Sequence, residues 1–112
     1  MAIPSGAGTE VLKRETLATG NGWREILSGS SDHIYTVISL IFTSETSTTG
    51  GVGIRMNNGA ADIAIVTWDG NMVNGYDTFV WNDKFVLEED DDLDCYNAQN
   101  GCWYLSYIDQ HF

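Results

Sequence analysis

The chain has 112 residues and a formal net charge of −11, from 16 acidic and 5 basic residues. Phosphate backbones and anionic membrane surfaces repel so acidic a chain, so its composition argues against nucleic-acid and membrane partners. Its 43% hydrophobic and 12% aromatic residues suffice for one modest core and are unlike the composition of a disordered chain. One domain is expected, and a domain this small gains stability from oligomerisation or docking.

The N-terminal part predicts an arm followed by strands. Residues 1–8 are small and contain Pro4, Gly6 and Gly8, which favours a flexible extended arm before a single β domain over residues 9–112. Residues 10–14 predict a first strand or clamp, residues 20–22 a turn, and residues 23–27 an alternating strand. Residues 1–30 show no basic region followed by an apolar stretch, so we expect a soluble product made in a cytoplasm.

The central part contains the strongest strand signals. Residues 33–42 are rich in β-branched and aromatic residues, and their near-continuous apolar character predicts a strand at the centre of the fold or at a subunit contact. Residues 43–51 are polar and predict a mobile loop. Residues 52–57 and 63–67 alternate around Asn58-Gly59, which predicts a hairpin with a type I′ turn.

The C-terminal part completes an all-β pattern. Residues 77–87 predict two short strands or one bulged strand, and residues 102–108 predict a final strand. No segment of ten or more residues shows helical periodicity. We therefore expect a single-domain antiparallel β-sandwich or small barrel of about seven to eight short strands.

Residues 88–94 form an acidic run with six carboxylates. Calcium is a candidate ligand because hard cations take several carboxylate oxygens, and Asp90, Asp92 and Asp94 are the weak candidate site. The run lacks EF-hand spacing. A solvated connection that discourages edge pairing is the favoured interpretation, and a basic partner surface is an alternative.

Cys95 and Cys102 flank a segment that is typical of a hairpin turn, so a disulfide between them is possible. Two reduced thiols are favoured, because disulfides are rare in a cytosol. Two cysteines cannot fill a zinc site, and His33 and His111 lack ligand-type spacing. Neither histidine lies near a signature for a nucleophile, and Gly50 to Gly53 does not continue into a phosphate-binding motif. The chain is expected to be non-enzymatic, with no cofactor.

The four tryptophans, Trp23, Trp68, Trp81 and Trp103, allow two interpretations. Core and subunit contacts are favoured, because large aromatic side chains dominate both. A sugar-binding surface built from exposed aromatic rings is the alternative.

Four stretches resemble small virion-associated proteins of marine tailed bacteriophages, which are decoration-like structural proteins. Residues 1–14 (MAIPSGAGTEVLKR) are similar to their shared start and residues 33–39 (HIYTVIS) to their central strand. Residues 80–87 (VWNDKFVL) and 104–110 (YLSYIDQ) are similar to the segment before their last hairpin and to their closing strand. The resemblance covers nearly the whole chain. Its motifs are structural, so it carries over no catalytic residues.

The resemblance implies a component of a virion, and capsid decoration (cement) is the first expectation. The arm and first strand would clamp the major capsid protein or another virion protein by adding a strand. The chain is expected to form a homo-oligomer, with a trimer favoured. A tail- or fibre-associated module, or a receptor module that binds carbohydrate, is the alternative. The expected partner-binding residues are Ile3, Pro4, Val11, Leu12, Lys13 and Arg14.

Overall fold

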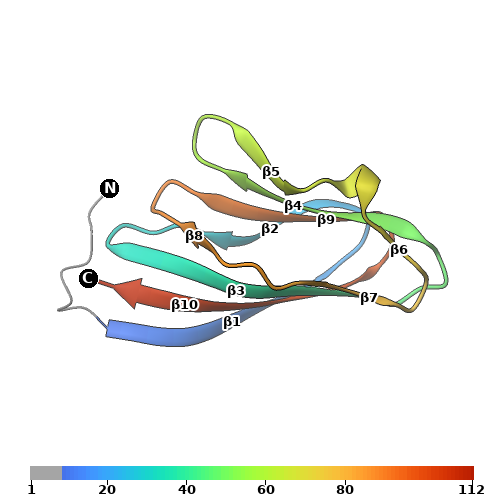
Figure 1. Ribbon diagram of the computed structural model, residues 1–112, viewed down its shortest axis with the longest axis horizontal. Coiled ribbons are helices and arrows are strands. Elements are labelled where there is room, and N and C mark those ends of the chain that lie inside the picture. Colours follow the sequence, from blue (N-terminus) through green and yellow to red (C-terminus); the bar gives the residue numbers. More distant parts are fainter. Residues whose placement is uncertain (1–8) are drawn as a thin grey trace.

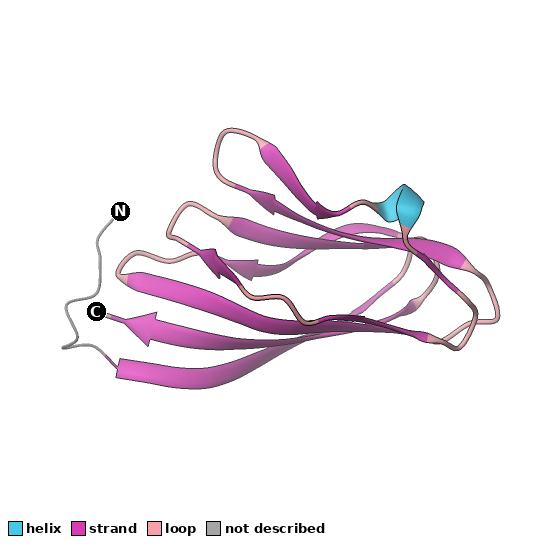
Figure 2. Ribbon diagram, in the orientation of Figure 1, coloured by secondary structure: helices cyan, strands magenta, loops and turns pink. Residues whose placement is uncertain are grey.

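Two antiparallel sheets pack face to face in the computed structural model, which describes residues 9–112 (Figure 1). Sheet A contains β1 (Thr9–Thr19), β3 (His33–Ser44), β7 (Thr78–Trp81), β8 (Phe85–Leu87) and β10 (Gly101–His111). Sheet B contains β2 (Gly22–Ser28), β4 (Gly50–Asn57), β5 (Asp62–Val66), β6 (Met72–Val73) and β9 (Asp92–Asn97). One 3₁₀ turn, Trp68–Gly70, follows β5 and is the helical element in Figure 2.

The strand order is that of a jelly roll. Sheet A runs β1-β10-β3 with β7 and β8 one after the other along β3, and sheet B runs β2-β9-β4-β5. Strands from opposite ends of the chain thus lie side by side, as in double Greek-key sandwiches. This confirms the predicted all-β antiparallel sandwich. Residues 9–112 form ten strands, more than the seven to eight expected, because residues 78–87 split into two and the short β6 adds another.

The core lies between the sheets and follows the alternation of the strands. On β10, every second residue from Trp103 to Tyr107 is buried, and on β9 Leu93 and Cys95 are fully buried. Side chains on successive strand residues point to opposite faces, so each strand gives one face to the core and one to the outside. The largest fully buried side chains are Trp103, Phe42, Leu40, Ile54, Leu87, Leu93 and Leu105.

The segment 33–42 forms β3 at the centre of sheet A, which confirms that prediction. The strand continues to Ser44, so the loop to β4 is shorter than the expected 43–51. Backbone hydrogen bonds hold this extension: Ser44 N donates to Asp77 O at 2.9 Å, and Glu45 N donates to Asn100 O at 3.0 Å. Polar composition alone does not show such long-range pairing.

The hairpin β4–β5 is confirmed, but its turn is not type I′. A type I′ turn needs positive φ at both central residues, whereas Gly59 has φ +89° and Asn58 does not have a positive φ. The loop spans residues 58–61 instead. A backbone hydrogen bond from Asn58 N to Ala61 O at 3.2 Å closes it. The Asn58 side chain adds to this, because its Oδ1 accepts from Ala60 N at 3.0 Å and Ala61 N at 2.9 Å, a pattern typical of Asn in turns.

The segment between Cys95 and Cys102 is not a hairpin. β9 belongs to sheet B and β10 to sheet A, so residues 98–100 carry the chain from one sheet to the other. The buried Asn97 side chain organises this crossover. Its amide donates to Gly20 O at 3.0 Å and Gln99 O at 2.5 Å, and its carbonyl accepts from Trp103 Nε1 at 3.1 Å. A buried polar side chain is tolerated here because all of its hydrogen-bonding groups are satisfied.

Asn97→Ala should destabilise the fold by about 2–3 kcal/mol, because it leaves the buried Trp103 N–H without its acceptor and removes the amide that links the two chain segments. Urea unfolding followed by tryptophan fluorescence measures the change. Asn82→Ala, in the exposed loop between β7 and β8, is the matched control and should change stability by less than about 0.5 kcal/mol. Equal effects of the two substitutions would contradict the role of Asn97.

Candidate interaction surfaces

The outer face of sheet A is largely apolar. Because alternate residues of β10 are buried, those between them point outward, and the register places their cross-strand partners on the same side. We call this surface the sheet A face. Its charged members are Glu10 and Arg14, both on β1, whereas the chain as a whole carries −11. The face comprises Glu10, Leu12, Arg14, Thr16, Ala18, Ile34, Thr36, Ile38, Ser39, Ile41, Thr43, Thr78, Val80, Val86, Cys102, Tyr104, Ser106, Ile108 and Gln110.

Large apolar side chains are exposed on this face. Leu12 is 70% exposed, and Val80, Val86 and Tyr104 are also exposed. Scattered exposed apolar residues are ordinary, but a contiguous apolar sheet face is typical of an interaction site. The sheet A face therefore has the composition of a docking surface.

A hollow of about 530 Å³ lies in the sheet A face next to β1. It coincides with a β-bulge, where the register between β10 and β3 shifts after Ser106 and gives β3 one extra residue, Ile38. Bulges bend a strand locally and re-aim its side chains, which accounts for the depression. The lining residues are Leu12, Lys13, Arg14, Ile38, Ser39, Tyr104 and Ser106.

β1 forms a long edge of sheet A. All eleven residues pair with β10 without a register shift, and within residues 9–112 β1 pairs with no other strand. The other edges are less regular: β2 carries a bulge, β5 has five residues, and the chain leaves β3 between β7 and β8. A long regular edge presents unpaired backbone groups that another strand can join. β1 is thus the edge best suited to strand addition.

A cluster around Asp109 holds β1 against the sheet. The Asp109 side chain is 6% exposed and lies 2.6 Å from His33 Nδ1 and 2.7 Å from Lys13 Nζ. His33 also stacks on His111, with ring centroids 4.4 Å apart. Burial opposes the charging of Asp109, but hydrogen bonds and charge attraction from His33 and Lys13 outweigh it and lower the pKa of the carboxyl. His33 thus has a structural contact that joins β3 to β10.

The structure brings four of the expected partner-binding residues together on β1. Leu12, Lys13 and Arg14 line the hollow. Leu12 and Arg14 belong to the sheet A face, whereas Val11 and Lys13 pair with the buried Asp109 and Tyr107 and lie on the other side of the strand. Ile3 and Pro4, with the rest of the expected arm, lie outside the described residues. The sequence pointed to this contact because residues 10–14 directly follow the expected arm. The sequence allowed a subunit contact for residues 33–42, but it did not predict that β7 and β8 contribute to the same surface, because this depends on strand order.

The carboxylates of the weak calcium candidate do not converge. Asp94 Oδ2 accepts from Arg55 Nε at 3.1 Å, Asp92 Oδ1 accepts from Ser28 at 2.7 Å, and Asp90 lies in the preceding turn. Among residues 9–112, no three His, Cys, Asp or Glu side chains are grouped so as to hold a metal ion. Asp94 and Asp92 are thus bonded to Arg55 and Ser28, and not to the calcium ion that was a weak candidate ligand.

The possible disulfide between Cys95 and Cys102 is not formed, and both thiols are free. Cys95 lies buried in sheet B, whereas Cys102 is exposed on the outside of sheet A, because the connection is a crossover and not a hairpin. Burial raises the pKa of the Cys95 thiol. A hydrogen bond to Glu45 at 2.6 Å raises the pKa of the Cys102 thiol.

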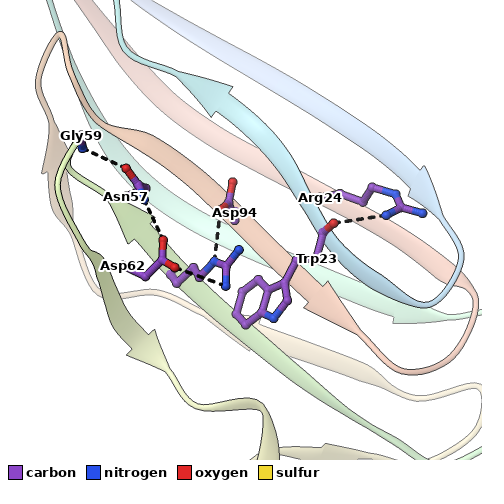
Figure 3. A network of polar contacts seen from close by, with 7 residues as sticks. Trp23, Arg24, Asn57, Gly59, Asp62 and Asp94 are labelled. Carbon is purple, nitrogen blue, oxygen red and sulfur yellow. Dashed lines mark hydrogen bonds and ion pairs between the residues drawn. The ribbon is translucent and has the colours of Figure 1, made fainter.

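The outer face of sheet B has a different character. The register aligns Trp23, Tyr96 and Gly53 across it, and the next row contains Glu25, Asp94 and Arg55. Polar contacts continue to Asp62 and Asn57, as Figure 3 shows. Aromatic and charged residues thus share this face, in contrast to the sheet A face.

No helix within residues 9–112 has the length and apolarity needed to cross a membrane.

No protein-family model and no curated protein matches the chain. A chain of Bacillus endospore appendages, described as a novel family of disulfide-linked pili, is similar in structure with a TM-score of 0.53 and 17% identity. The match covers 99% of this chain and 95% of that one. A chain from infectious bursal disease virus, Gx strain, has a TM-score of 0.52 and 9% identity, over 91% of this chain and 30% of that one. At such identities the likeness shows the fold alone.

Acid should selectively remove the stabilisation supplied by Asp109. A carboxyl with a lowered folded-state pKa stabilises the fold at neutral pH, and this contribution is lost as pH falls below about 4 towards the folded pKa. Asp109→Asn should be less stable than wild type at pH 7, and the gap should narrow between about pH 5 and pH 2. Urea unfolding at several pH values measures the gap. A gap that stays constant would contradict the ion-pair account.

The two thiols should differ in accessibility. Under native conditions a thiol-reactive dye should label Cys102 alone, slowly because of its raised pKa, and should label Cys95 after unfolding in urea. Peptide mass spectrometry identifies the labelled residue. Native labelling of Cys95 at the rate of Cys102 would contradict the placement of β9 in the core.

Proposed function

We propose that this protein is a non-enzymatic structural subunit of a virion, and specifically a capsid decoration protein that binds and stabilises the assembled shell. The observation that carries the proposal is the sheet A face: a largely apolar outer sheet surface in a strongly acidic protein. Removing such a surface from water on a partner stabilises the complex by roughly 25 cal/mol per Å² of apolar area. The sheet A face is the side on which the protein would dock.

The edge strand β1 supplies the second part of the contact. A strand of the shell protein would add to β1, with backbone hydrogen bonds giving affinity and the hollow beside Leu12 giving specificity. Arg14 would meet an acidic group of the partner, whereas Lys13 stays paired with Asp109, and residues 1–8 would extend the contact. Homotrimer formation, which suits threefold sites of a shell, belongs to the same proposal.

The fold and the resemblance support this assignment. Jelly rolls recur in viral capsid proteins, although a fold alone does not determine function. The two similar structures named above come from endospore pili and from the bursal disease virus. The stretches at residues 1–14, 33–39, 80–87 and 104–110 resemble virion-associated proteins of tailed phages. Together these features favour a structural subunit over an enzyme.

Leu12→Asp combined with Tyr104→Asp should weaken binding to purified empty capsids at least about tenfold, because both changes place charge in the buried contact. Co-sedimentation of labelled protein with capsids measures the affinity and the copy number. Met72→Asp is the matched control, since Met72 is 61% exposed but lies on β6 outside the sheet A face.

Saturation at a copy number comparable to that of the shell subunits, lost in the double variant and kept in Met72→Asp, is the expected result. Binding of a handful of copies would contradict decoration. Equal binding by both variants would contradict the sheet A face as the contact.

A further inference from the structure

A second hollow lies on the opposite side of the sandwich, at the outer face of sheet B. It has a volume of about 190 Å³. Two tryptophans border it: Trp23 from β2 and Trp68 from the 3₁₀ turn, the latter 49% exposed. Tyr96 links them, with its ring centroid 5.3 Å from that of Trp23 and 5.5 Å from that of Trp68. The full lining is Trp23, Arg55, Asp62, Ala64, Val66, Thr67, Trp68 and Asp69.

Glycines on β4 allow the rings to lie this close to the sheet. A Cβ at Gly53 would come within 3.1 Å of both Trp23 and Trp68, and a Cβ at Gly51 would overlap the Trp68 carbonyl. The 3₁₀ turn therefore packs directly on β4 and holds the Trp68 ring beside the sheet. An indole left half in water beside a preformed hollow is a surface available to a ligand with an apolar face.

The polar side chains of the hollow are fixed by one another. The Arg55 guanidinium lies over the Trp23 ring, 4.2 Å from its centroid, donates to Asp94 at 3.1 Å and pairs with Asp62 at 3.7 Å. Asp62 in turn accepts from Asn57 at 2.8 Å, and Asn57 accepts from Gly59 N (Figure 3). This chain of contacts orients a donor and an acceptor before any ligand arrives, which lowers the entropy cost of binding.

The charged groups and aromatic rings that line this hollow favour one class of ligand. One guanidinium, Arg55, and two carboxylates, Asp62 and Asp69, line the hollow, so an anion meets more repulsion than attraction and a cation is repelled by Arg55. A hydroxyl group both donates and accepts, and so matches this mixed set. Flat rings beside the polar groups favour a ligand with an apolar C–H face. A neutral sugar ring has both features, and concave sites with aromatic walls and a few fixed polar groups are typical of small-molecule recognition.

We propose that the outer face of sheet B binds neutral carbohydrate, with a sugar ring stacked on Trp68 and its hydroxyls bonded to Arg55 and Asp62. The site lies on the face of the sandwich opposite the sheet A face. A protein docked through sheet A would therefore display the sugar site outward. The two surfaces are separate, so either proposal can fail without the other.

The test begins with an array of neutral, sialylated and sulfated oligosaccharides, probed with the labelled full-length protein. The strongest neutral oligosaccharide is then titrated against wild type and variants, with intrinsic tryptophan fluorescence as the signal. Trp68→Ala should weaken binding about tenfold, and Arg55→Lys, which keeps the charge but loses the planar fork, should also weaken it. Tyr76→Ala, an exposed aromatic outside both hollows, is the matched control and should bind as wild type does.

Urea unfolding midpoints verify that each variant is folded. If Trp68→Ala does not fold, the affinity of Arg55→Lys alone tests the proposal. Neutral glycan binding that is weakened in Trp68→Ala and in Arg55→Lys, and kept in the control variant, supports the proposal. Binding of sialylated or sulfated glycans alone, of a proline-rich peptide in place of sugars, or of no ligand would overturn it. Equal affinities of wild type and both sheet B variants would overturn it as well.

Discussion

The crossover at Asn97 is the constraint on which the two faces depend. A jelly roll must move its chain between sheets, and here one buried amide serves two of these passages, bonding Gly20 between β1 and β2 and Gln99 between β9 and β10. Trp103, the largest buried side chain, completes the amide's contacts. A polar side chain satisfied in this way specifies one arrangement, because any other register leaves it unpaired in the core. The alignment of both sheets follows from this point.

The two outer faces then diverge because of what each strand places outward. Sheet A presents Ile, Val, Leu and Tyr side chains with few charges, and its edge strand β1 is long and regular. Sheet B presents aromatic rings interleaved with an arginine and several carboxylates, many of them paired with one another. An apolar face suits a protein partner that excludes water from a wide area, whereas a small polar and aromatic hollow suits one small ligand. Under the two proposals, attachment and recognition use opposite faces of the sandwich.

Local patterns predicted the strands, and long-range pairing decided the rest. Alternation in residues 52–57 and 63–67 was enough to place a hairpin, and β-branched residues were enough to place β3. Whether Cys95 and Cys102 could face each other depended on which sheet each strand joined. Their spacing in the chain does not contain this information. Glu10 to Arg14 could be proposed as a contact from its position after the arm. A sugar-binding surface was an alternative for the tryptophans, but the sequence could not select Trp23 and Trp68 for it, because these two meet only through the sheet order and through the glycines of β4.

Docking through sheet A, with sheet B outward, can be tested by an electron cryomicroscopy map of capsids saturated with the protein. Such docking requires density in which β1 and the sheet A face lie against the shell, a shell strand runs beside β1, and Trp68 points to solvent. Density with sheet B against the shell, or no ordered density on the shell, would contradict it.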